Sequence, residues 1–151
     1  GLDRQYGRIH RTARKVHRLG LQNVRLARVD AVQGMEDLLP DGSVTTFYIF
    51  FPDPWPKRRH HRRRLICPEF LDLLHRKLTD SGCVHFATDH QDYGKVVAAC
   101  FAEDPRFAGI EPMQPTDEER TNFEILFADQ NKPICRLSVR KACGYEKSAT
   151  E

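Results

Sequence analysis

The stretch that decides the fold is VTTFYIFFPDPWPKRRHHRRR, residues 44–64. It opens with eight residues, Val44 to Phe51, that are all β-branched or aromatic. An uncharged run of this length is typical of a strand buried on both faces, as in a parallel sheet. A loop, Pro52 to Arg64, follows this strand. We therefore expect a buried parallel strand that delivers a proline-rich and strongly basic loop at its carboxyl end.

Helical and strand patterns alternate on both sides of this stretch, which favours an α/β fold with a largely parallel sheet. No internal repeat and no Gly/Ser linker interrupts the alternation, so residues 1–151 are expected to form a single domain, with 142–151 frayed. The expected helices cover residues 4–19, 32–39, a segment from Pro68 that ends before Gly82, a segment around Tyr93 to Phe101, and 121–129. The other expected strands cover residues 1–2, 24–29, 83–87, 107–110 and 134–140.

The composition excludes several classes of protein. Hydrophobic residues make up 40% and charged residues 30% of the 151 residues, unlike a disordered chain. No apolar stretch approaches the roughly 18 residues of a membrane span, and the first residues lack the apolar block of a signal peptide. The five cysteines are odd in number and form no C-x-x-C pair, which indicates a reducing compartment and a cytoplasmic protein. Cys67 with His60 and His61 fits no zinc spacing, so no metal is expected.

Charge is distributed unevenly along the chain. Residues 1–64 carry 14 basic and 6 acidic groups, whereas residues 65–151 carry 10 basic and 15 acidic groups. The run from Lys57 to Arg64 contains six Lys or Arg residues and two His residues. Such a block attracts polyanions, and nucleic acid is the first partner to consider. A solvated loop or a localisation signal stays open as the alternative.

Acidic residues follow the first four expected strands, at Asp3, Asp30, Asp53 and Asp89. In α/β folds, ligands bind at the carboxyl ends of the strands. Aspartate is also common in turns, but four in succession favour a binding site at this edge of the sheet.

The segment from Phe50 to Lys57 combines an acid and an indole between prolines. Proline fixes its own φ and favours extended geometry in the residue before it, so the segment is expected to be stiff. Trp55 can cover the face of a nucleobase while Asp53 accepts hydrogen bonds from ring N–H or amine groups. The alternative is a rigid turn with a packed tryptophan.

Three segments together identify a family. The block FFPDPWPKRRHHRRR at 50–64, F-A-T-D at 86–89 and T-x-F-E at 121–124 closely resemble the tRNA (guanine-N7)-methyltransferases. The resemblance runs from residue 1 to about residue 141. It implies a Rossmann-like class I methyltransferase sheet, S-adenosyl-L-methionine as cofactor, and methyl transfer to N7 of a guanine in the variable loop of tRNA. It leaves the oligomeric state open.

The resemblance also implies roles for individual residues. Asp53 matches the catalytic or base-orienting carboxylate and is also expected near the cofactor. The other implied cofactor-binding residues are Asp3, where the family usually has Glu, and Asp30 with Ala31 near the adenine. The implied substrate-binding residues are Lys57, Arg59, His60, His61, Arg62, Arg63, Arg64, Asp89, Thr121, Asn122, Phe123 and Glu124. Thr121 and Glu124 also form a helix-capping pattern, and capping need not exclude substrate contact.

One departure from the family pattern affects the expected activity. The sequence has no E-x-G-x-G-x-G motif, the Gly-rich loop that wraps the methionine half of the cofactor in the family. We therefore expect a chain shortened at its N-terminus, without the first strand, this loop and the first helix. Two outcomes stay open, an inactive member of the family and a non-catalytic RNA-binding module. A nuclease using Asp53 and Asp89 for Mg²⁺ is disfavoured because no phosphate-cradling Gly loop is present.

The first expected helix has two different faces. Apolar residues recur at intervals of three or four residues, from Tyr6 to Val16, and so form one face of the helix. The opposite face carries a basic stripe of Arg4, Arg8, Arg11, Lys15 and Arg18. This stripe is either a solvated face or an auxiliary RNA-binding surface.

Overall fold

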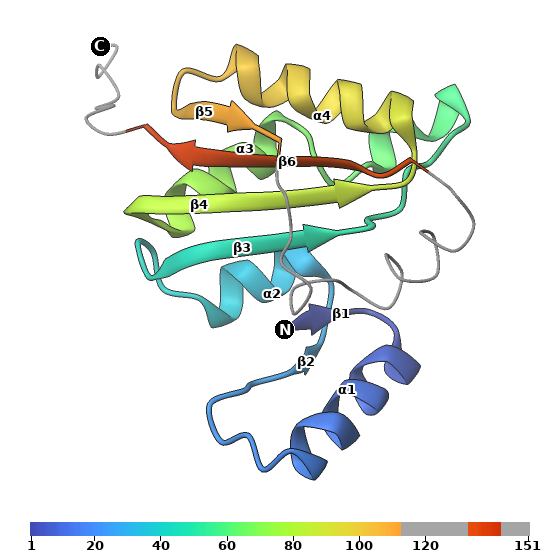
Figure 1. Cartoon of the computed structure of the whole chain (residues 1–151), viewed down its shortest axis with the longest axis vertical. Coiled ribbons are helices and arrows are strands. Elements are labelled where there is room, and N and C mark those ends of the chain that lie inside the picture. Colours follow the sequence, from blue (N-terminus) through green and yellow to red (C-terminus); the bar gives the residue numbers. More distant parts are fainter. Residues whose placement is uncertain (113–132, 143–151) are drawn as a thin grey trace. The chain divides into compact units, whose positions relative to one another are not determined.

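The computed structural model of the protein describes residues 1–112 and 133–142 (Figure 1). Contacts within the chain divide it into two compact units, Gly1–Pro40 and Asp41–Glu151. Each unit has its own sheet.

The first unit holds β1 (Leu2–Asp3), α1 (Tyr6–Arg18), β2 (Ala27–Arg28) and α2 (Ala31–Leu38). β1 and β2 pair in parallel, with Leu2 opposite Ala27. The two expected helices are confirmed within a few residues. The strand expected over 24–29 is shorter than the sequence pattern indicated.

α1 ends at a glycine, as the sequence predicted. Gly20 has a φ of 65°, a left-handed conformation that glycine adopts without a steric penalty. Its N–H donates to the carbonyl of His17, and the N–H of Leu21 donates to that of Val16, both at 3.1 Å. These two bonds form a Schellman motif and satisfy carbonyl groups left over at the helix end.

The described residues of the second unit form a four-stranded sheet, two α-helices and a short 3₁₀ helix. The strand order is β3-β4-β6-β5, in which β3 and β4 run parallel, whereas β6 is antiparallel to both β4 and β5. The expectation of a largely parallel sheet is therefore wrong for this half, because a strand's periodicity does not reveal its direction. The elements are β3 (Val44–Phe50), η1 (Arg58–Arg63), α3 (Pro68–Lys77), β4 (Leu78–Thr88), α4 (Gln91–Glu103), β5 (Phe107–Glu111) and β6 (Cys135–Lys141).

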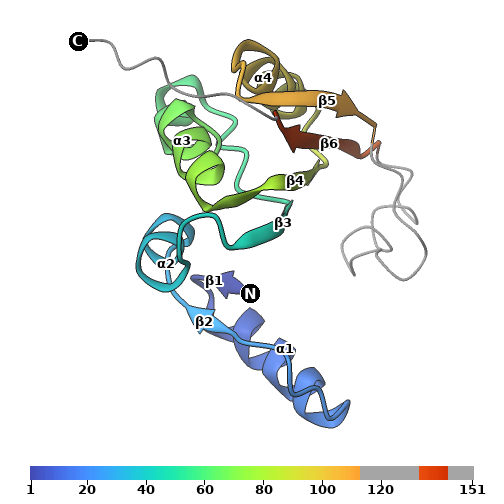
Figure 2. The same cartoon turned by 90° about the vertical axis from the view of Figure 1, so that its left-hand side faces the viewer.

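The core of the second unit lies between the sheet and the helices α3 and α4, which cover the same face (Figure 2). Tyr93 of α4 meets Phe86 of β4 edge to face, with ring centroids 5.8 Å apart. Phe101 of α4 and Phe107 of β5 pack in the same way at 5.1 Å. The fully or nearly fully buried side chains include Phe70, Leu71, Leu74, Leu78, Val84, Phe86, Tyr93, Val97, Phe101, Leu137 and Val139.

Two further expectations are corrected. The strand over 44–51 is not buried on both faces, since Tyr48 is 54% exposed and β3 lies at the edge of its four-stranded sheet. Aromatic and β-branched residues suit a half-buried strand as well as a buried one. β4 starts at Leu78, directly after α3, and not at Cys83. The helix expected over 121–129 lies outside the described residues.

A glycine brings α4 close to β6. A Cβ built on Gly94 would lie 2.5 Å from the Sγ atom of Cys135 and 2.8 Å from its Cβ atom. Because the Cβ of Cys135 belongs to a rigid part of the strand, a larger residue at position 94 must push the helix away from the sheet.

We predict that Gly94→Ala lowers the free energy of unfolding by about 1–3 kcal/mol, as overpacking usually does. Gly7→Ala in α1 is the control, because the nearest atom to a Cβ there is 4.0 Å away. This control should raise stability by about 0.5–1 kcal/mol, since alanine favours a helix. Urea denaturation measures both. Equal stability of Gly94→Ala and the unchanged protein would contradict the packing described here.

Candidate functional site

Asp53 and Asp89 follow the carboxyl ends of two paired parallel strands. In the register of β3 and β4, Phe50 lies opposite Ala87. The N–H of Phe51 donates to the carbonyl of Ala87 at 2.8 Å, which continues the ladder one residue past β3. Both carboxylates are exposed at this edge. The expectation that these two acids share one edge of the sheet is confirmed.

The backbone between β3 and η1 is strained at two positions. Phe51 has a φ of 52° and Trp55 a φ of 43°, and each precedes a proline. The expectation of extended geometry before proline is wrong at these two residues. Left-handed conformations of non-glycine residues cost about 1–3 kcal/mol each and persist only where surrounding contacts impose them. The hydrogen bond from Phe51 to Ala87 is one such contact.

Arg64 supplies a second contact that holds this segment. Its Nε donates to the carbonyl oxygen of Pro54 at 2.9 Å. Its guanidinium carbon lies 4.9 Å from the centre of the Tyr93 ring, within the range of a cation–π interaction. Tyr93 is fully buried on α4, and its hydroxyl accepts a hydrogen bond from the N–H of Ile66 at 3.3 Å. Burial raises the pKa of Tyr93. Arg64 therefore fastens the loop to the core.

The indole of Trp55 is half-buried among basic side chains. The guanidinium of Arg63 lies over its ring at 5.1 Å, and the imidazole of His60 meets it edge to face at 5.7 Å. Asp53, Trp55 and the cationic segment therefore belong to one short stretch of chain that follows the carboxyl end of β3. Stacking of this indole on a nucleobase stays a prediction.

The basic segment is a 3₁₀ helix and not the loop that we expected. η1 covers Arg58–Arg63, and the N–H of His60 and that of Arg64 close its turns. Within the described part of the chain, no carboxylate lies within 4.0 Å of its exposed cations, which with the preceding lysine are Lys57, Arg58, Arg59, Arg62 and Arg63. The segment thus presents positive charge that no described acid neutralises.

The remaining expected site residues lie in the first unit or outside the described residues. Asp3 follows β1, and its carboxylate accepts from the N–H of Gln5 at 2.7 Å and lies 3.4 Å from Arg8. Asp30 follows β2 and caps α2 through the N–H of Val32 at 3.0 Å. Ala31 is the first residue of α2. Thr121, Asn122, Phe123 and Glu124 lie outside the described residues.

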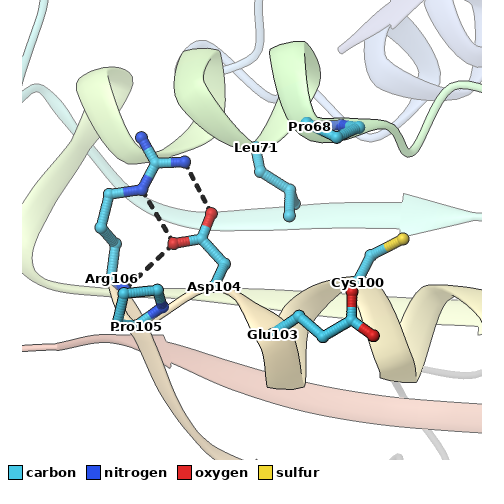
Figure 3. A pocket seen from close by; sticks show the side chains of 7 residues that line it. All are labelled: Pro68, Leu71, Cys100, Glu103, Asp104, Pro105 and Arg106. Carbon is cyan, nitrogen blue, oxygen red and sulfur yellow. Dashed lines mark hydrogen bonds and ion pairs between the residues drawn. The ribbon is translucent and has the colours of Figure 1, made fainter.

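A surface cavity of about 370 Å³ lies apart from these residues, between α3 and α4 (Figure 3). Arg106 closes one side of it, paired with Asp104 at 2.6 Å and with Asp72. Hydrogen bonding to Arg106 lowers the pKa of Asp104. The cavity is lined by Pro68, Leu71, Cys100, Glu103, Asp104, Pro105 and Arg106, none of which is an expected site residue.

Sequence reasoning missed the residues that hold the site in place. Tyr93 was expected only as a core residue of a helix, and Arg64 only as a phosphate ligand. No local pattern links them, because all of α3 and all of β4 lie between them in the sequence. Among the described residues, no group of three His, Cys, Asp or Glu could hold a metal ion, and no helix is long and apolar enough to cross a membrane.

A family model described as "Putative methyltransferase" matches residues 1–137. The chain belongs to this methyltransferase family. The match covers both units and every described residue that was expected in the site.

The chain has curated relatives with a more specific name. It is 40% identical over 124 residues to a tRNA (guanine-N(7)-)-methyltransferase of Nitrosococcus oceani, covering 82% of this chain and 52% of the relative. It is 51% identical over 112 residues to the enzyme of the same name from Halorhodospira halophila, covering 70% of this chain and 48% of the relative. The resemblance drawn from the sequence is confirmed. The chain spans about half the length of these relatives.

A solved structure supports the fold of this chain. A putative methyltransferase from Streptococcus mutans, in complex with SAH, superposes with a TM-score of 0.57 at 14% identity, covering 93% of this chain and 74% of that one. The expected Rossmann-like class I methyltransferase fold is confirmed.

We predict that Arg64→Ala lowers the free energy of unfolding by about 2–3 kcal/mol, since a charged hydrogen bond and a cation–π contact are lost. Arg64→Lys should recover little, because one ammonium cannot reproduce both contacts. The control is Arg62→Ala, an exposed cation of the same segment, which should change stability by less than about 0.5 kcal/mol. Urea denaturation of the three variants checks this, and equal effects at positions 62 and 64 would refute the anchoring role.

Proposed function

We propose that this methyltransferase acts on tRNA, transferring a methyl group to N7 of a guanine in the variable loop, with both units belonging to one catalytic domain in the cytoplasm. The observation that carries the proposal is the arrangement at the end of β3. There two exposed carboxylates, Asp53 and Asp89, follow paired parallel strands, and a run of cations without described acidic partners begins four residues after Asp53. A carboxylate can accept hydrogen bonds from the nucleobase, and the cations can bind the phosphates, which are the two chemical parts of an RNA substrate.

The residues present fit the adenosine half of S-adenosylmethionine, the cofactor that we propose. Asp3 and Asp30 follow paired parallel strands, where carboxylates can accept from ribose hydroxyls and from the adenine amine. Ala31 opens α2, and the first N–H groups of a helix have no acceptor within it. The N–H of Ala31 is thus suited to donate to an adenine ring nitrogen.

The proposed reaction asks little proton chemistry of the protein. When bound, the cofactor supplies a methyl group on a positively charged sulfonium. Guanine N7 holds a free lone pair that would accept this methyl group, and the demethylated cofactor would be the leaving group. No base has to remove a proton first, so alignment of N7 with the methyl carbon at ~3–3.5 Å provides most of the acceleration.

Asp53 has two tasks in this proposal. It accepts hydrogen bonds from N1–H or the exocyclic amine of the guanine and so orients the ring. The guanine becomes positively charged as the methyl group arrives, and a nearby carboxylate stabilises that charge. Asp89, on the neighbouring strand end, assists in the same way. Lys57 and the arginines of η1 bind phosphates and position the tRNA without reading its sequence.

We predict that Asp53→Asn and Asp53→Ala lower kcat by about 10²-fold, the usual cost of losing one preorganised electrostatic contact. The assay follows labelled methyl transfer from S-adenosylmethionine to a tRNA transcript. Asp92→Asn is the control, because this exposed carboxylate lies in α4 and not at a strand end.

A second substrate sharpens the test. A tRNA carrying 7-deazaguanine at the variable-loop position has no N7 lone pair and should accept no methyl group. Methylation of this RNA, or normal rates for both Asp53 variants, would refute the proposed chemistry. Binding of tRNA without any methyl transfer would instead favour an RNA-binding module.

A further inference from the structure

α1 of the first unit has an unusual charge for a single helix. Its 13 residues include five arginine or lysine side chains, two histidines and no acidic residue, and none of its residues is buried. A helix normally gains stability from acidic residues in its first turn and from pairs of opposite charge on its surface. α1 has neither within its own sequence.

Four of these cations form one stripe. Arg11, Arg14, Lys15 and Arg18 stand at i, i+3, i+4 and i+7, so they share one face over about 10 Å of helix. A shallow hollow runs along the flank of this stripe, and its lining also includes His10, Ala13 and His17. The half-buried Ile9 and Val16 belong to the opposite face.

The stripe also lacks described acidic partners. Arg4 and Arg8, on the flank that approaches the strands, lie 3.7 Å from Asp30 and 3.4 Å from Asp3. For the four residues of the stripe, no carboxylate of the described residues lies within 4.0 Å. Like charges at these spacings repel one another and destabilise a helix. A polyanion bound along the stripe removes that repulsion.

We infer that the stripe of Arg11, Arg14, Lys15 and Arg18 is a second phosphate-binding surface, which holds the sugar–phosphate backbone of the same tRNA. The inference rests on the proposed function and extends it beyond the segment Lys57–Arg64. Arginine and lysine on an exposed helix bind phosphates through charge and hydrogen bonds without base specificity.

The composition of the helix favours RNA over a membrane surface. A helix that lies in a lipid interface buries large apolar residues such as Trp, Phe and Leu. The apolar face of α1 offers Ile9, Ala13 and Val16, and only Tyr6 among its large apolar side chains is mostly exposed.

The test compares two variants that remove equal charge. Arg14→Gln/Lys15→Gln removes two cations of the stripe, and Lys95→Gln/Arg140→Gln removes two exposed cations of the second unit. Glutamine keeps the helix propensity of the residues it replaces, which circular dichroism verifies. Affinity for a tRNA transcript is measured by filter binding between 50 and 200 mM salt.

The stripe variant should bind tRNA about tenfold more weakly at 50 mM salt, with a salt dependence of log K shallower by about 1–2, whereas the control pair changes neither. Arg58→Gln/Arg59→Gln serves as a reference for the proposed function. A stripe variant that binds like the unchanged protein, while this reference variant binds weakly, overturns the inference and leaves the proposed function intact. Failure of the unchanged protein to bind tRNA overturns both. Loss of binding to anionic vesicles with unchanged tRNA affinity assigns the stripe to membranes and also overturns the inference.

Discussion

The contacts of Arg64 hold together the parts of the protein that the proposed chemistry needs. Its guanidinium bonds the carbonyl of Pro54 at 2.9 Å and lies over the buried ring of Tyr93. The strained backbone at Phe51 and Trp55 depends on such fixed neighbours, because left-handed φ values are unfavourable in a free chain. Through these two contacts Arg64 connects the segment that carries Asp53, Trp55 and the exposed cations to the hydrophobic core.

In the proposed function, the residues that orient the guanine and those that bind the phosphates are different but lie close together in the sequence. The parallel pairing of β3 and β4 sets Asp53 and Asp89 at one edge of the sheet, where a flat base can be oriented. The exposed arginines of η1 follow at once, and the proposed function assigns them to the phosphates of the tRNA. Because methylation at N7 requires no proton removal, a rigid acceptor and a well-placed backbone are sufficient contributions from this part of the protein.

The positions of the described α-helices and of the acids at the strand ends could be predicted from the sequence. The predictions that were wrong or missing have physical reasons. Periodicity located the helices, and Pro68 at the start of α3 and Gly20 after α1 marked their limits correctly. The direction of β6 was not predictable, since pairing depends on distant strands. The 3₁₀ helix was hidden because like-charged residues carry no amphipathic pattern. The contact between Arg64 and Tyr93 joins positions that only the tertiary fold brings together. The roles of Asp3, Asp30 and Ala31 stay predictions.

Trp55 is the only tryptophan of the chain, so its fluorescence reports directly on the predicted stacking of its indole on a nucleobase. The decisive measurement is the emission of Trp55 during titration with tRNA, with binding followed independently by the anisotropy of labelled RNA. Stacking of a guanine on the indole predicts quenching that saturates with binding and that weakens in Asp53→Asn. Saturated tRNA binding with unchanged Trp55 emission would contradict the account.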